Sequence, residues 1–153
     1  MKKPFILLTG DDSVRAEGLI LVKRIVEKFA DFQIIATKEQ HSACSAKMNL
    51  KGGKWGKEMI DGVEAIWLDG SPADSVYFAF DYLKRKPDLV ISGLNMGENN
   101  SNGMYSSGTI AAALTAADSR NTNTIAFSMV TPAELWLKKH DGSFDETLLD
   151  YPG

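Results

Sequence analysis

The chain has 153 residues and a formal net charge of −3 at pH 7, from 17 Lys and Arg against 20 Asp and Glu. This length favours a single domain over residues 1–153 with a substantial core, and the sequence has no basic block of the kind that nucleic-acid-binding proteins carry. The single cysteine cannot form an intrachain disulfide, no signal-peptide pattern opens the sequence, and no apolar stretch reaches the roughly 18 residues that span a bilayer. We therefore expect a cytoplasmic protein that binds neither polymeric nucleic acid nor a membrane.

A short apolar run from Phe5 to Thr9 ends, after Gly10, in two adjacent carboxylates, Asp11 and Asp12. The run predicts a buried strand, and the apolar spacing over residues 17–30 predicts an amphipathic helix after it. The acids would then lie at the carboxyl end of a strand, where open α/β sheets bind ligands. Two neighbouring carboxylates indicate either a site for a hard cation such as Mg²⁺ or Mn²⁺, or a solvated pair that caps the helix.

The next segments continue the alternation of strands and helices. Residues 32–36 predict a second strand parallel to the first, followed over residues 37–53 by a polar loop that carries His41 and Ser42. Residues 54–68 suggest a hairpin or an extra strand, with a turn at residues 61–62. A helix should start at Ser71 as the cap, with Pro72 in the first turn and Asp74 at the third position, and end near residue 85.

The second half of the chain adds two strands and a candidate phosphate site. Residues 88–93 predict a strand, and Asn95 falls in the long loop expected over residues 94–105. Ser107, Gly108 and Thr109 open a helix expected over residues 110–118, and a helix start of this kind either binds phosphate or is a plain N-cap. A strand over residues 124–128, a short helix over residues 132–139 and a polar tail complete the chain.

Four of these segments should meet at one edge of the sheet, which favours a metal-assisted phosphomonoester hydrolase. Carboxylate, hydroxyl and amide oxygens suit a hard cation, and no His or Cys cluster suggests a softer metal. His41 and His140 are isolated, and we interpret both as ordinary polar residues, His41 being the better candidate for a base. Cys44 is more typical of a small packed residue than of a nucleophile. No dinucleotide-binding or Walker glycine motif is present.

The residues from 5 to about 128 resemble the SurE family, the stationary-phase survival proteins that are metal-dependent nucleoside monophosphate phosphatases. Five short motifs carry the resemblance, in the order in which the family has them. Each motif alone is weak, but the ordered set of five is specific. Leu7 to Asp12 resembles the family's Thr-Asn-Asp-Asp-Gly, and Ala36 to Ser42 occupies the place of its Ala-Pro-Asp and a following Ser. Gly70 to Val76 resembles Gly-Thr-Pro-Ala-Asp-Cys-Val, and Pro87 to Gly97 resembles Pro-Asp-Leu-Val-Val-Ser-Gly-Ile-Asn-Xaa-Gly. Ser107 to Thr109 keeps the family's spacing from Asn95.

The resemblance implies a three-layer α/β/α Rossmann-like fold with a mostly parallel sheet, in which the family's carboxyl-terminal part is absent and residues 131–153 form a divergent or truncated tail. It implies a homo-oligomer, dimer or tetramer, that hydrolyses nucleoside 5′- or 3′-monophosphates with one Mg²⁺ or Mn²⁺ per subunit. Asp11 and Asp12 would be catalytic. The implied cation ligands are Asp11, Asp12, Ser42 and Asn95, and the implied phosphate ligands are Asn95, Ser107, Gly108 and Thr109.

Four positions depart from the family pattern near these residues. Gly10 stands where the family has Asn, Ser13 and Ala43 where it has Gly, and Ser106 where it has Tyr. These departures bear on the rate and on substrate choice, while all four implied cation ligands are kept. The alternative is a catalytically inactive nucleotide-binding or interaction protein derived from the same fold.

Overall fold

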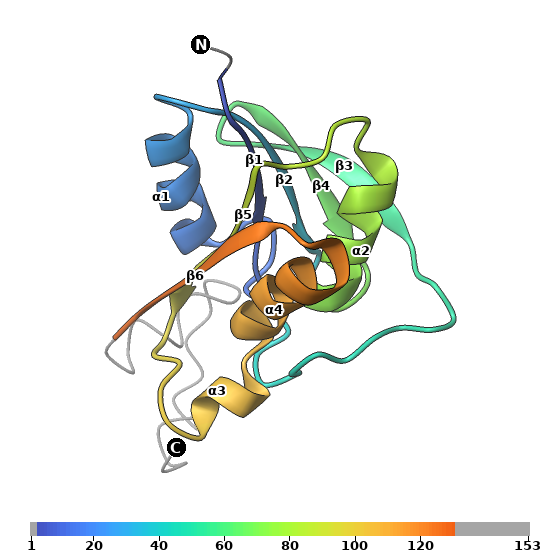
Figure 1. The fold of residues 1–153 in the computed structure, drawn as a ribbon, viewed down its shortest axis with the longest axis vertical. Helices are drawn as coiled ribbons and strands as arrows, with labels where there is room; N and C mark the ends of the chain where they lie inside the picture. Colours follow the sequence, from blue (N-terminus) through green and yellow to red (C-terminus); the bar gives the residue numbers. More distant parts are fainter. Residues whose placement is uncertain (1–2, 131–153) are drawn as a thin grey trace.

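The computed structural model describes residues 3–130, in which strands are interspersed with helices along the chain (Figure 1). The helix expected over residues 132–139, the polar tail and His140 lie outside this range. The strands are β1 (Phe5–Thr9), β2 (Asp31–Thr37), β3 (Trp55–Ile60), β4 (Val63–Leu68), β5 (Leu89–Met96) and β6 (Asn123–Met129). The helices are α1 (Glu17–Val26), α2 (Pro72–Tyr82), α3 (Gly103–Ser106) and α4 (Gly108–Arg120).

The strands form one sheet in the order β3-β4-β2-β1-β5-β6. All neighbours are parallel except β3, which pairs with β4 in an antiparallel hairpin. Residues 54–68 are therefore a hairpin, and its second strand also extends the parallel sheet beside β2. The expected mostly parallel α/β sheet is confirmed.

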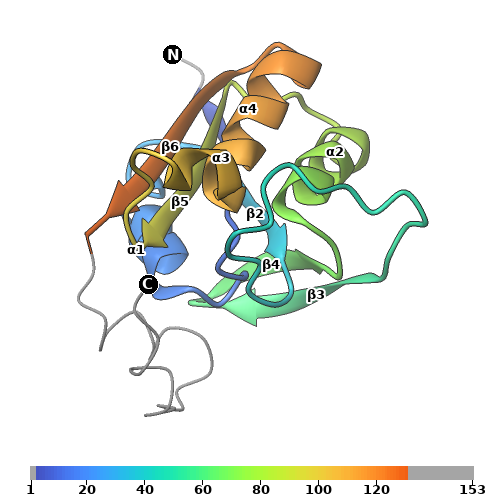
Figure 2. The same cartoon turned by 90° about the horizontal axis from the view of Figure 1, so that it is seen from below.

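Helices cover both faces of the sheet, which gives the expected three layers (Figures 1 and 2). On β1, Ile6 and Leu8 pack in the same buried cluster as the apolar side chains of α1. Leu7, which points to the opposite face because side chains alternate along a strand, packs with residues of α2 and α4. β1 therefore contributes side chains to two buried cores, one on each face of the sheet.

Several boundaries differ from the sequence-based prediction. α1 and α2 end earlier than expected, and Leu83, the C-cap of α2, already has an extended backbone. β5 continues to Met96, so that Asn95 lies in a strand rather than in a loop. The strand is longer because its pairing with β6 resumes at Asn95 and Ser128 after a shift in register.

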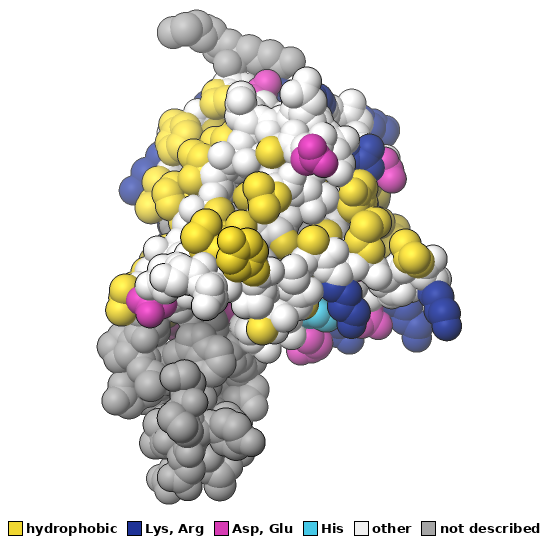
Figure 3. Space-filling model, turned by 60° about the horizontal axis from the view of Figure 1, so that its bottom comes forward, with side chains coloured by type: hydrophobic (Ala, Val, Ile, Leu, Met, Phe, Trp, Pro, Cys, Tyr) yellow, Lys and Arg dark blue, Asp and Glu magenta, His cyan; other side chains and the backbone are white. Residues whose placement is uncertain are grey.

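Apolar side chains remain exposed at the end of the described chain. They gather in several patches on the face shown in Figure 3. A groove of about 760 Å³, lined among others by Ser45, Tyr105, Ser107 and Leu114, runs along α3 and α4. The exposed large apolar residues of α3, α4, β6 and the residue after it are Met104, Tyr105, Leu114, Ile125, Phe127, Met129 and Val130.

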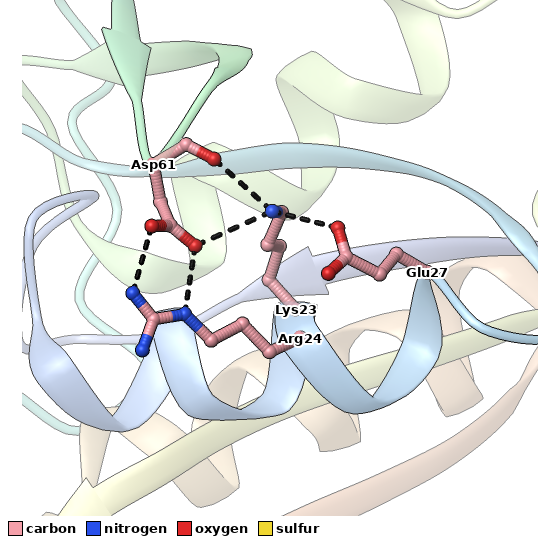
Figure 4. Close-up of polar contacts among 4 residues, drawn as sticks. All are labelled: Lys23, Arg24, Glu27 and Asp61. Atoms are coloured by element: carbon pink, nitrogen blue, oxygen red, sulfur yellow. Dashed lines mark hydrogen bonds and ion pairs between the residues drawn. The ribbon is translucent and has the colours of Figure 1, made fainter.

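A cluster of four charged residues ties the β3–β4 turn to α1 (Figure 4). Arg24 donates two hydrogen bonds to the Asp61 carboxylate, at 2.9 and 2.8 Å. Lys23, whose side chain is only 6% exposed, reaches Asp61 Oδ2 at 3.3 Å and Glu27 at 2.7 Å. The ammonium group of Lys23 can be buried here because it lies between two carboxylates.

Candidate metal and phosphate site

Asp11 and Asp12 are buried at the carboxyl end of β1, with exposed fractions of 4% and 6%. Neither caps α1, because the N-cap of that helix is Ala16 and no side chain bonds to it. The alternative of a solvated, helix-capping pair is therefore wrong. Two adjacent carboxylates that are buried away from water need hydrogen-bond donors or a cation close by to stabilise their negative charge.

Asn95 joins the two acids at this edge of the sheet. Asp11, Asp12 and Asn95 line one small cavity at the ends of β1 and β5. The Met96 amide donates to Asp12 Oδ2 at 3.3 Å, and the Asn95 amide nitrogen donates to the Gly97 carbonyl at 2.7 Å. With its nitrogen engaged in this way, Asn95 has its amide oxygen as the end that can bind a cation.

The first turn of α4 rests directly on Asp11. The Thr109 hydroxyl, buried with an exposed fraction of 0%, donates to Asp11 Oδ1 at 2.5 Å. A Cβ on Gly108 would lie 2.8 Å from Asp11 Cβ, so no larger residue fits there. Ser107 caps the helix, its hydroxyl accepting from the Ile110 amide at 3.1 Å, so the N-cap interpretation of this residue is confirmed.

The loop after β2 passes beside the same edge. The His41 amide donates to the Asp11 carbonyl at 2.7 Å, and the Ser45 amide donates to the Ser106 carbonyl at 2.8 Å. Ser42 follows His41 and is half-buried, but it does not line the cavity formed by Asp11, Asp12 and Asn95. The structure thus brings three of the four implied cation ligands into one cavity and leaves Ser42 beside it.

Two departures from the family pattern occupy strained backbone positions in this region. Ser13 has φ of +84° and Ala43 has φ of +58°. Both values lie in the left-handed region, which L residues other than Gly rarely adopt. The family's glycine at each position is what this backbone favours.

Burial shifts the pKa of both His41 and Cys44 toward the uncharged form. For His41, burial and then the nearby Lys47 lower the pKa below its usual value, which favours the neutral imidazole. Burial raises the pKa of the Cys44 thiol, and the negative charge of Asp11 raises it further. A protonated thiol is a poor nucleophile, which agrees with the expectation for this residue.

Sequence reasoning missed a layer of buried hydroxyl groups beneath the site. Thr9, Thr37 and Ser92 are each 0% exposed; Thr9 and Thr37 end β1 and β2, and Ser92 lies in the middle of β5, paired with Thr9. By the alternation of side chains along each strand, all three lie on the face that carries α2 and α4. Each follows an apolar run, and this switch from apolar to hydroxyl side chains was the available signal.

The oxygen donors of the site fit a hard cation. They are two carboxylates and one amide oxygen in the cavity, with a serine hydroxyl nearby. Across residues 3–130, no three His, Cys, Asp or Glu side chains group together as a metal site. Oxygen donors without His or Cys suit Mg²⁺ or Mn²⁺ rather than zinc or copper.

No helix within the described residues is both long and apolar enough to cross a bilayer.

Comparisons with known proteins identify a family and several relatives of the chain. The family described as "Survival protein SurE" matches residues 6–148. The chain is 39% identical over 110 residues to a protein named 5′-nucleotidase SurE from Mannheimia succiniciproducens, covering 71% of this chain and 44% of that protein. A 5′-nucleotidase SurE from Chloroflexus aggregans is 32% identical over 144 residues, covering 92% and 54%.

A solved structure shares the fold. The crystal structure of the SurE protein from Aquifex aeolicus superposes with a TM-score of 0.74 at 25% identity, covering 85% of this chain and 52% of that one. The chain spans about half the length of the curated relatives it matches.

Proposed function

The chain belongs to the family of the survival protein SurE, and from this premise we propose that it is a metal-dependent phosphomonoesterase that hydrolyses nucleoside 5′- or 3′-monophosphates. One observation carries the proposal: Asp11, Asp12 and Asn95 line a single cavity, and the first turn of α4 packs against Asp11. A carboxylate pair beside a helix N-terminus suits a cation and a phosphate together. The relatives named 5′-nucleotidase support the choice of substrate.

Asp11, Asp12, Asn95 and Ser42 are the proposed ligands of one Mg²⁺ or Mn²⁺ ion. When bound, such an ion polarises a phosphoryl oxygen and lowers the pKa of water. The two carboxylates provide the negative charge that attracts the cation, and the amide oxygen of Asn95 adds a neutral donor. Ser42 would complete the set from the loop after β2, which the His41 amide already holds against Asp11.

The proposed phosphate site is the start of α4 together with Asn95. The first amides of a helix have no partner within the helix and lie at the positive end of its dipole. Gly108 and Thr109 present these amides next to Asp11, and Ser107, whose amide donates to the Gly103 carbonyl, adds its hydroxyl, so charge that develops on the phosphoryl oxygens is stabilised there. Water attacks phosphorus, the bond to the nucleoside oxygen breaks, and that oxygen leaves with a proton.

Asp11 and Asp12 are also the proposed catalytic residues, since they are the carboxylates next to the phosphate site. As ligands of the cation, both carboxylates would lie beside the attacking water, and one of them would accept its proton and pass it to the leaving nucleoside oxygen. Their burial favours this chemistry, because an acceptor in a site of low dielectric interacts more strongly with the groups around it.

We also propose that the chain is a single domain, acts in the cytoplasm and forms a homo-oligomer. The exposed apolar side chains of α3, α4 and β6 support self-association, because apolar patches of this kind mark protein–protein contacts. Polymeric nucleic acid is not a proposed partner, since the net charge is −3.

A second candidate is an inactive nucleotide-binding protein. The strained backbone at Ser13 and Ala43, beside the cation ligands, favours it, because strain there can displace those ligands.

A phosphate-release assay separates the two candidates. The purified protein is incubated with adenosine, guanosine and uridine 5′- and 3′-monophosphates, with Mn²⁺, with Mg²⁺ and with EDTA. The phosphomonoesterase releases phosphate with a metal and loses activity in EDTA. Nucleotide binding by calorimetry without phosphate release would favour the inactive protein, and full activity in EDTA would refute the metal mechanism.

A further inference from the structure

We infer that the side-chain hydroxyl of Thr109 positions Asp11 and does not bind the substrate phosphate, an inference that rests on the proposed function. The side chains of both residues are buried, and Thr109 Oγ1 donates to Asp11 Oδ1 at 2.5 Å. A threonine hydroxyl has one proton. While that proton is shared with Asp11, the hydroxyl offers a phosphate only lone pairs, which a phosphate oxygen repels.

The backbone of α4 holds Thr109 in this position. Gly108 brings the helix so close that an added Cβ would lie 2.8 Å from Asp11 Cβ and 2.9 Å from its Oδ2. The first turn of the helix therefore cannot move toward the carboxylate, and any side chain at residue 108 would push it away. The contact between Thr109 and Asp11 follows from this close approach, across 98 residues of sequence.

The neighbouring hydroxyl is used differently. Ser107 Oγ accepts a hydrogen bond from the Ile110 amide, and this leaves its own proton available as a donor. Ser107 is itself only 5% exposed, but it lines the groove along α4, which Thr109, at 0% exposed, does not. Of the two hydroxyls at the helix start, Ser107 is thus the one that can donate to a phosphate oxygen.

The hydrogen bond from Thr109 fixes the orientation of the Asp11 carboxylate. Holding Oδ1 also sets the direction of Oδ2, because both oxygens lie in one plane. Groups that orient a metal ligand in this way change metal affinity or activity by about 10- to 100-fold when they are removed. Thr109 therefore acts on cation affinity, through Asp11.

The test compares three variants with the wild type. Thr109→Val removes the hydroxyl and keeps the shape, Thr109→Ser keeps the hydroxyl, and Ser107→Ala removes the neighbouring hydroxyl. Mn²⁺ affinity is measured by calorimetry in the absence of nucleotide, and KM and kcat are measured for a nucleoside monophosphate at saturating Mn²⁺. Melting curves without metal establish that each variant is folded, and Thr109→Ala replaces the valine variant if that one does not fold.

The expected pattern separates the two roles of the helix start. Thr109→Val should weaken Mn²⁺ binding by about 10- to 100-fold, Thr109→Ser should restore it, and Ser107→Ala should raise KM with Mn²⁺ affinity unchanged. Wild-type Mn²⁺ affinity in Thr109→Val together with a raised KM would overturn the inference and make Thr109 a phosphate ligand. A wild-type protein that binds no Mn²⁺ would instead refute the proposed function itself.

Discussion

Replacing Ala43 by glycine should stabilise the fold. Ala43 has φ of +58° in the loop after β2, and its side chain is exposed. At this φ the Cβ of an L residue crowds the following carbonyl oxygen, which glycine avoids. The SurE pattern, which the sequence otherwise follows through this loop, has glycine at the same position. Ala43→Gly should therefore relieve strain without removing a packed side chain.

The expected gain is the difference between two opposing effects. A left-handed conformation costs an L residue about 1–2 kcal/mol. Glycine makes the unfolded chain more flexible, which reduces the stability of the folded state by about 0.4–1 kcal/mol. With the middle of each range, the net gain in the free energy of unfolding is about 0.8 kcal/mol, or a rise in Tm of about 2–3 °C for a domain of this size.

Thermal and urea denaturation followed by circular dichroism measure the change, with Ala46→Gly as the matched control. Ala46 is an exposed alanine of the same loop with negative φ. Its replacement relieves no strain and should lower the stability by about 0.4–1 kcal/mol. The two substitutions should therefore shift Tm in opposite directions. A lower Tm for both variants would refute the argument from backbone strain.

Three further substitutions test the site, the packing beneath it and the charged cluster. Asp12→Asn should abolish phosphate release while the melting curve without metal stays cooperative, and Asp118→Asn, which changes an exposed carboxylate of α4, should leave the rate unchanged. Gly93→Ala should lower the free energy of unfolding by about 3 kcal/mol or more, because Gly93 has φ of +103° and the added Cβ would lie 2.3 Å from a backbone carbonyl oxygen of β6. An unchanged midpoint of urea denaturation would contradict this packing. Asp61→Asn should lower Tm at neutral pH, because hydrogen bonds from Arg24 hold the pKa of Asp61 well below its usual value. That difference should shrink progressively as the pH falls below about 4, because the unfolded chain then takes up a proton at Asp61 while the folded carboxylate stays charged until the pH reaches its lowered pKa. A difference that does not depend on pH would exclude this cause.

Local signals in the sequence were enough to predict features that depend on a few neighbouring residues. The start of α2 is an example, since Ser71 and Asp74 form a capping box with Pro72 in the first turn. The position of Asp11 and Asp12 at the end of a buried strand also followed from the apolar run before them. These features depend on backbone bonds and burial within one element.

Features that depend on contacts between distant segments could not be predicted. Asn95 was expected in a loop, because the pairing that extends β5 involves β6 about 30 residues later. The burial of Lys23 also depends on a distant segment, since this residue of α1 is 5% exposed because Asp61 from the hairpin turn lies over it. The role of Thr109 needed the packing of α4 on β1, which no spacing within either segment indicates.

The charged cluster of Figure 4 couples two segments that would otherwise open separately. At the edge of the described sheet, β3 pairs with β4 alone, and a strand in that position usually frays first. Lys23 and Arg24 bind the tip of this hairpin at Asp61, so the hairpin cannot swing away from α1 without exposing a buried ammonium group. The hairpin and α1 should therefore exchange their amide hydrogens as one cooperative unit, with the edge strand protected to the same degree as the helix.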